Sequence, residues 1–92
     1  MMGKTAPFRR TFQLAAGYQL QRDPSGSGHI LISPKGSIQL NESAAMILEL
    51  CNGKFTGEEI VARILLSRND TLASDVRAFL DAAERRGWIV AI

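Results

Sequence analysis

Hydrophobic residues change their spacing within the stretch LNESAAMILELCNG, residues 40–53. A helix is expected to begin directly after Asn41, because the side chain of this residue can accept a hydrogen bond from the first helical turn. The apolar residues that follow recur at i, i+3, i+4 and i+7, which predicts one apolar stripe. They are Ala44, Ile47, Leu48 and Cys51. Gly53 is expected to supply the left-handed position just past this helix.

Upstream, residues 17–40 show the period of two that is typical of β-strands. Apolar and polar residues alternate over Tyr18–Gln21, and a loop rich in Gly, Ser and Pro follows at residues 23–28. Further strands are expected at His29–Ser33 and Ser37–Leu40, joined by a turn that contains Pro and Gly. These segments together predict a three-stranded antiparallel meander.

Two more helices are expected downstream. Thr56 followed three residues later by Glu59 is a capping box, which predicts the start of the second helix. The pair Asn69-Asp70 interrupts the apolar stripe of that helix, and a third helix carries apolar residues over Leu72–Ala83. Gly87 is expected to end the third helix, with the following tryptophan folding back as the contact of a Schellman cap.

The order of these elements predicts an α+β fold in which a three-stranded antiparallel meander precedes three helices, a winged helix-turn-helix-like arrangement. Residues 1–16 show no sustained period, so a flexible N-terminal arm is expected there and a single domain at residues 17–92. The link at residues 39–42 has no Gly or Pro to enforce a tight return. We therefore expect a strand-exchanged homodimer at high concentration.

The amino-acid composition does not indicate any class of binding partner. Eleven Lys and Arg against nine Asp and Glu leave a net charge of +2, which is too small to recruit nucleic acid by itself. No apolar run approaches the roughly 20 residues that span a bilayer, so no membrane segment is expected. The single cysteine cannot form an intrachain disulfide, which favours a cytoplasmic location.

The sequence predicts no enzyme and no metal or cofactor site. His29, the single histidine, is interpreted as a solvated residue at a strand end, because no titratable residue is placed to orient it. Cys51 lies on the apolar stripe of the first helix, where a cysteine behaves as a small hydrophobe. The acidic residues of the third helix lack the spacing of a metal loop or of an acid–base pair.

Two kinds of binding remain. A winged three-helix unit can place its third helix in the DNA major groove, but this helix carries as many acidic as basic residues. The strand Ser37–Leu40 is short and contains neither charge nor Pro, so it lacks most devices that discourage pairing at a sheet edge. Such an edge can accept an extended peptide as a further strand.

The residues from about Gly17 to Trp88 resemble the pyrroloquinoline quinone biosynthesis protein D (PqqD) family. The stretch Leu40–Gly53 is similar to the first-helix signature of that family. Glu59-Ile60 in the second expected helix, and Asp75-Val76 and Phe79-Leu80 in the third, also lie where the family has them.

The resemblance implies a non-catalytic recognition element, or chaperone, for a ribosomally made and post-translationally modified peptide (RiPP). Its partners would be the precursor peptide PqqA and the radical S-adenosylmethionine (SAM) enzyme PqqE, to which the peptide is presented. By position, the third strand would pair with the peptide and the third helix would supply a groove wall. The residues so implied are Ser37, Ile38, Gln39, Leu40, Asp75, Val76, Arg77, Phe79, Leu80 and Asp81.

Three hypotheses follow for the chain. The first is the peptide carrier, without cofactor, metal, nucleic acid or membrane. The second is a winged-helix DNA-binding regulator. The third is a structural subunit of the modifying enzyme, which differs from the first only in whether the chain binds peptide without that enzyme. For the third helix itself, Arg77 and Asp81 are spaced i, i+4 and are expected to pair with each other unless they contact a ligand.

Overall fold

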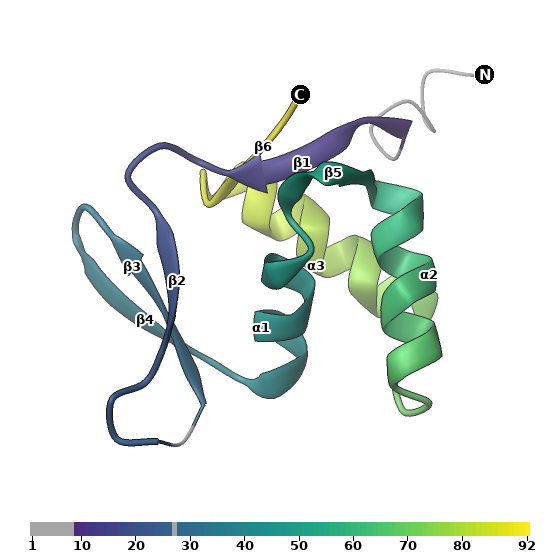
Figure 1. Cartoon of the computed structure of the whole chain (residues 1–92). Helices are drawn as coiled ribbons and strands as arrows, with labels where there is room; N and C mark the ends of the chain where they lie inside the picture. The colour runs from purple at the N-terminus through teal and green to yellow at the C-terminus, as the bar shows by residue number, and fades with distance from the viewer. Residues whose placement is uncertain (1–8, 27) are drawn as a thin grey trace.

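The computed structural model describes residues 9–26 and 28–92. Two three-stranded sheets flank three helices, with strand orders β2-β3-β4 and β5-β1-β6 (Figure 1). The elements in chain order are β1 (Thr11–Leu14), β2 (Gln19–Arg22), β3 (His29–Ser33), β4 (Gly36–Leu40), α1 (Glu42–Glu49), β5 (Asn52–Thr56), α2 (Gly57–Ser67), α3 (Ala73–Arg85) and β6 (Ile89–Ala91). The predicted α+β meander followed by three helices is confirmed, and the second sheet was not predicted.

The meander is antiparallel throughout. Leu31 at the centre of β3 pairs with Leu20 on β2 and with Ile38 on β4, and its side chain is fully buried. One face of this sheet packs against α1. The predicted third strand is longer by one residue, since it begins at Gly36.

The expectation of a flexible arm is wrong for the segment just before the meander. Residues 11–14 form β1, which lies between β5 and β6 at the centre of the second sheet. Phe12 is only 2% exposed and belongs to the core. A four-residue strand held by pairing on both sides needs no long alternation, which is why the sequence pattern did not reveal it. Residues 1–8 of the expected arm lie outside the described residues.

Gly53 does not cap the first helix. That helix ends at Glu49 with Leu50 as its C-cap, and Gly53 lies inside β5 with φ +84°. The register between β1 and β5 shifts by two residues between the pairs Thr11–Thr56 and Gln13–Asn52. The left-handed conformation of Gly53 therefore belongs to a β-bulge, where such a conformation is common.

The other helix boundaries follow the local signals. Asn41 Oδ1 accepts a 2.8 Å hydrogen bond from the Ala44 N–H at the start of α1. Thr56 and Glu59 form the reciprocal capping box of α2. At the end of α3 the Trp88 N–H donates to the Ala83 carbonyl and the Gly87 N–H to the Glu84 carbonyl, which is the bond pattern of a Schellman motif.

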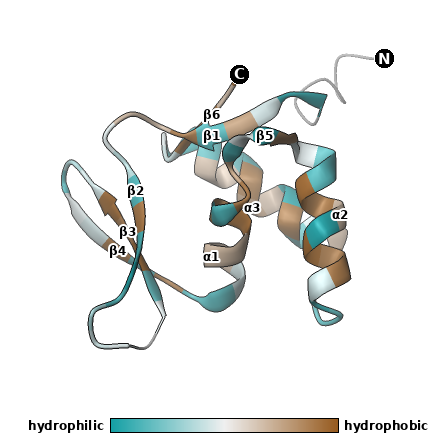
Figure 2. Cartoon of the chain, in the orientation of Figure 1, coloured by the Kyte–Doolittle hydropathy of each residue, from teal (hydrophilic) through white to brown (hydrophobic). Residues whose placement is uncertain are grey.

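A single core joins the two sheets to the helices. Buried apolar residues of all three helices belong to this core, and Figure 2 marks the hydrophobic segments in brown. The largest fully buried side chains come from both sheets and every helix: Phe12, Leu31, Leu48, Ile60, Ile64, Val76, Leu80 and Ile89. The meander is thus held with one face on the core and with its two outer strands, β2 and β4, at free edges.

Candidate peptide-binding site

The free edge of β4 presents unpaired backbone groups. The Asp23 N–H donates to the Gly28 carbonyl, so the alternation of an antiparallel ladder directs Gly28 and every second residue after it toward β2. The residues between them, 29, 31 and 33, then bond to β4. Ser37 and Gln39 are therefore the β4 residues whose N–H and C=O groups point away from the sheet.

The side chains of β4 leave this edge open. Ile38 and Leu40 are half-buried and pack against the core, whereas Ser37 and Gln39 are exposed. The strand carries no charged residue and no Pro. The predicted edge is thus confirmed as the outer strand of its sheet, with few features that oppose strand addition.

Two hollows near β4 are lined in part by the face of α3 and the residues that follow it. A hollow of about 170 Å³ lies between α1 and α3 and is lined by Asn41, Ser43, Ala44, Ile47, Thr71, Asp75, Val76 and Phe79. A second, of about 360 Å³, is lined by the β3–β4 turn, the start of β4, Tyr18, Arg86 and Trp88. Phe79 lines the first hollow and Trp88 the second, and the two rings meet edge to face with centroids 6.4 Å apart. The two hollows are together called the α3 groove below.

The structure brings only some of the six implied α3 residues to this groove. Asp75 and Phe79 line it, and the fully buried Val76 forms part of its floor. Leu80 is 1% exposed and belongs to the core alone. Arg77 and Asp81 each form an ion pair outside the groove.

The expected pair between Arg77 and Asp81 does not form. Arg77 Nη2 lies 3.2 Å from Glu58 Oε1 on α2, and Asp81 Oδ2 lies 2.8 Å from Arg85 Nη2 one turn further along α3. The side chain of Arg77 reaches across to the neighbouring helix, because α2 and α3 pack against each other. Arg77 lines neither hollow of the α3 groove.

The substitution Arg77→Ala is expected to leave peptide affinity within about twofold of the unchanged protein, because Arg77 pairs with α2 rather than with the groove. The free energy of unfolding should fall by less than about 1 kcal/mol, since both partners are partly exposed. Fluorescence titration and urea unfolding measure the two quantities. A tenfold loss of affinity in a folded variant would contradict this placement.

Sequence reasoning missed Arg86 and Trp88 as groove residues. Asp75 and Phe79 of α3 and its C-cap Arg86 are spaced i, i+4 and i+11, close to whole helical turns, so extending the stripe from Phe79 would have found Arg86. Trp88 was interpreted only as the contact of a helix cap. Its indole also forms a wall of the hollow beside β4.

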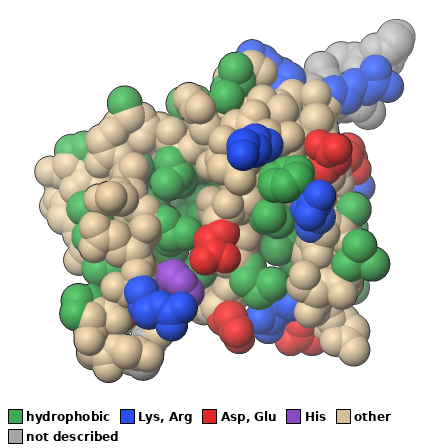
Figure 3. Space-filling view, in the orientation of Figure 1, with side chains coloured by type: hydrophobic (Ala, Val, Ile, Leu, Met, Phe, Trp, Pro, Cys, Tyr) green, Lys and Arg blue, Asp and Glu red, His purple; other side chains and the backbone are tan. Residues whose placement is uncertain are grey.

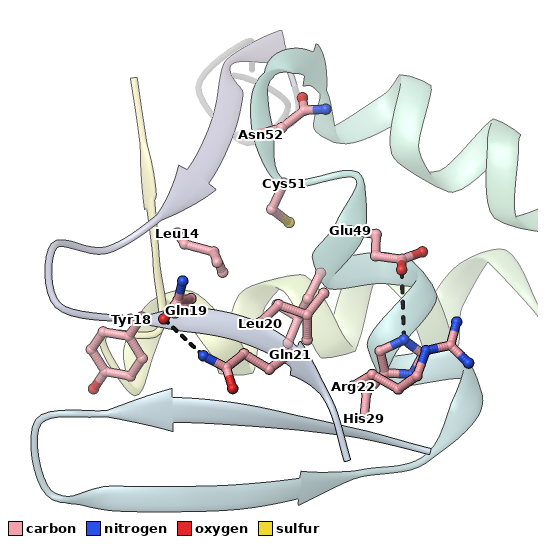
Figure 4. A pocket seen from close by; sticks show the side chains of 11 residues that line it. Leu14, Tyr18, Gln19, Leu20, Gln21, Arg22, His29, Glu49, Cys51 and Asn52 are labelled. Atoms are coloured by element: carbon pink, nitrogen blue, oxygen red, sulfur yellow. Dashed lines mark hydrogen bonds and ion pairs between the residues drawn. The ribbon is translucent and has the colours of Figure 1, made fainter. Parts of the chain in front are cut away.

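A larger hollow, of about 520 Å³, lies at the opposite edge of the meander (Figure 4). It contains His29, whose side chain is 25% exposed and whose Nε2 lies 3.7 Å from Glu49 Oε2. His29 lies at the start of β3, as expected, but the expectation that no titratable residue is placed to orient it is wrong. The fold brings a carboxylate from α1 to it, a contact that lies 20 positions away in sequence.

Cys51 is 3% exposed, and its thiol donates to the Ile47 carbonyl at 3.4 Å. Burial raises the pKa of this thiol to about 12. Because only the thiolate is a nucleophile, Cys51 should be inert near neutral pH. Its assignment as a small core residue is confirmed by its burial.

We expect iodoacetamide to alkylate Cys51 in the native protein at least about a hundredfold more slowly at pH 8 than it alkylates free cysteine, because the raised pKa keeps the buried thiol protonated. The same protein in urea serves as the control and should react at the free rate. Mass spectrometry over time measures both. Equal native and denatured rates would show an accessible thiolate.

Within residues 9–26 and 28–92, no group of three or more His, Cys, Asp or Glu side chains is arranged to hold a metal ion. No helix in the same ranges has the length and apolar character needed to cross a membrane.

Comparison with known proteins identifies the family. The sequence profile described as Coenzyme PQQ synthesis protein D (PqqD) matches residues 28–89, which include the β4 edge and all of α3. The chain belongs to the PqqD family. A protein of Azotobacter vinelandii named PqqA binding protein is 38% identical over 79 residues, covering 84% of this chain and 86% of that protein. One of Acinetobacter baylyi with the same name is 35% identical over 75 residues, covering 79% and 76%.

Solved structures share the fold. The solution structure of the PqqD part of Methylobacterium extorquens PqqCD, described as a stand-alone RiPP recognition element, matches with a TM-score of 0.65 at 20% identity and covers 86% of this chain and 87% of that one. The heterocyclase TruD matches with a TM-score of 0.69 at 17% identity, covering 90% of this chain and 12% of that chain. The PqqD-family fold therefore also occurs as a small part of a much longer protein.

Proposed function

We propose that this chain is a non-catalytic peptide chaperone of PQQ biosynthesis that binds the precursor peptide PqqA as an added strand on β4 and presents it to the radical SAM enzyme PqqE. The observation that carries the proposal is the free edge of β4 beside the α3 groove. Membership of the PqqD family, and relatives named as PqqA binding proteins, support the choice of peptide.

The backbone of β4 supplies the affinity. Ser37 and Gln39 offer two N–H and two C=O groups, each worth about 1 kcal/mol when paired. Alternate side chains of an added strand would turn toward the α3 groove, where Phe79 and Ile47 provide apolar surface. After the cost of ordering the peptide, an affinity of about micromolar is expected.

The charges along the groove suggest which end of the peptide is acidic. Lys35 and Arg86 line the hollow at the start of β4, and Asp75 lines the hollow between α1 and α3. An acidic side chain of the bound segment therefore fits near the β3–β4 turn. A basic or neutral polar side chain fits near Asp75.

The test is a titration of ¹⁵N-labelled protein with PqqA peptide and, separately, with duplex DNA. We expect PqqA to shift the amide resonances of Ser37–Leu40 together with those of Phe79 and Trp88. DNA should shift none of them, because acidic and basic residues cancel over α3 and its C-cap Arg86. Shifts produced by DNA but not by PqqA would favour the winged-helix regulator instead.

Presentation to PqqE is tested by activity. PqqE is expected to convert PqqA when this chain is present and to convert it poorly when the chain is absent. Conversion that does not depend on the chain would contradict presentation while leaving peptide binding intact. Binding of PqqA only when PqqE is present would favour a structural subunit. The cytoplasm is the proposed location, consistent with a single buried thiol.

The strand-exchanged homodimer stays a proposal. In this fold, two links join the meander to the helical half, and not one as the sequence predicted. One residue, Asn41, separates β4 from α1, while Ala15–Tyr18 connects β1 to the meander. Because β1 pairs with β5 and β6, the meander is tied to the helical half at both of its ends. Exchange therefore needs both links to straighten. Light scattering over a dilution series measures it, and a constant mass of 10.1 kDa up to millimolar concentration would exclude it.

A further inference from the structure

The hollow at the β2 edge has the form of a second docking groove. Figure 4 shows β2 along one side, with Leu14 from the end of β1 and the Cys51–Asn52 segment across from it. Its volume of about 520 Å³ lies within the range of protein ligand pockets. The apolar side chains lining it are Leu14, Leu20, Leu48 and Cys51.

The backbone of β2 is free along this groove. The ladder alternation that directs residues 19, 21 and 23 toward β3 leaves the N–H and C=O groups of Leu20 and Arg22 directed outward. β2 is the outer strand of its sheet, opposite β4. An extended chain can therefore add to β2 while another occupies β4.

One end of the groove carries a cation that lacks a carboxylate. Among the described residues Arg22 forms no ion pair, and its side chain is exposed. The carboxylate of Glu49, which also lines the groove, lies 3.7 Å from His29 Nε2 and forms no ion pair with Arg22. Figure 3 shows the histidine with basic and acidic atoms on either side of it, below a hollow in which hydrophobic side chains are visible.

We propose that the edge of β2 docks an extended segment of another protein that carries an aliphatic side chain and, two residues along, a carboxylate. The spacing follows from the strand: Leu20 and Arg22 are two residues apart on one face, so a paired strand brings every second side chain opposite them. The aliphatic group packs at the apolar floor and the carboxylate reaches Arg22. This docking does not depend on what occupies β4.

A second copy of the chain is a poorer occupant. β2 has the sequence QLQR and contains no acidic residue, so pairing β2 with itself gives Arg22 no carboxylate. The register that sets the two Arg22 residues opposite each other would also be repulsive. The charge of the groove thus favours a partner of different sequence.

The probe is the acetylated and amidated peptide TTLTETT, with TTLTQTT as its matched control. In ¹⁵N titrations we expect TTLTETT to shift the amides of Leu20 and Arg22 and to bind about two- to fivefold more tightly than TTLTQTT, the range of an exposed ion pair. Arg22→Gln should abolish that difference. Arg85→Gln, which removes the same charge from α3, should preserve it.

Several results would overturn the proposal. They are shifts confined to Ser37 and Gln39, no shifts at millimolar peptide, equal affinities for the two peptides, and a preference that survives Arg22→Gln. Doubling of the protein mass, with Leu20 and Arg22 shifting as protein concentration rises in the absence of peptide, would assign the edge to a second copy instead.

Discussion

Gln39→Pro is expected to abolish strand addition on β4 while leaving the protein folded. The N–H of Gln39 points away from β3, so proline removes a donor that only an added strand uses. The proline ring also blocks the approach of the peptide backbone. Affinity for PqqA should fall at least about tenfold, equivalent to about 1.4 kcal/mol.

The matched control is Gln39→Ala. It removes the same side chain, including the 3.4 Å contact from Nε2 to Asp23 Oδ2, but keeps the backbone N–H. It should bind PqqA almost as the unchanged protein does. Calorimetric titration gives the affinities, and thermal unfolding shows whether both variants keep their Tm within a few degrees. Equal binding by a folded Gln39→Pro variant would exclude the strand-addition geometry.

Phe12→Ala should be among the most destabilising single substitutions in the chain. Phe12 is 2% exposed on the central strand of the second sheet, and truncating a buried Phe to Ala costs about 3–5 kcal/mol. A domain of this size has a total stability of about 5–15 kcal/mol. We therefore expect a large fraction of the Phe12→Ala variant to be unfolded at temperatures well below the Tm of the unchanged protein.

Urea unfolding followed by circular dichroism measures this loss. The control is Gln13→Ala on the same strand, whose side chain is exposed and whose removal should cost less than about 0.5 kcal/mol. A cost below about 1 kcal/mol for Phe12→Ala would mean that the segment behaves as an arm in solution.

Elements with signals close together in sequence could be predicted. The capping box joins Thr56 to Glu59, and the Schellman motif joins Trp88 to Ala83. Each helix boundary therefore depends on residues that lie close together in the sequence. The meander could be predicted for the same reason, because its strands alternate and are joined by short turns. That β4 could accept a further strand was then predicted from its lack of charged residues and Pro alone.

Features set by distant partners could not be predicted. β1 becomes a strand because Phe12 pairs with Ala91 and Thr11 with Thr56, at separations that no local pattern records. Arg77 prefers Glu58 on another helix to the neighbour one turn away on its own. In the same way, His29 meets Glu49 only after the meander packs on α1.

The pairing of β1 with β6 brings together the first and the last strand of the described residues. Phe12 is the register partner of Ala91, so a longer polypeptide containing this fold would enter and leave it at neighbouring points. Adjacent entry and exit points let a domain be inserted into a host protein without stretching or dividing either one. Neither β2 nor β4 belongs to the sheet that holds these points, so both strand edges would stay open in such a fusion.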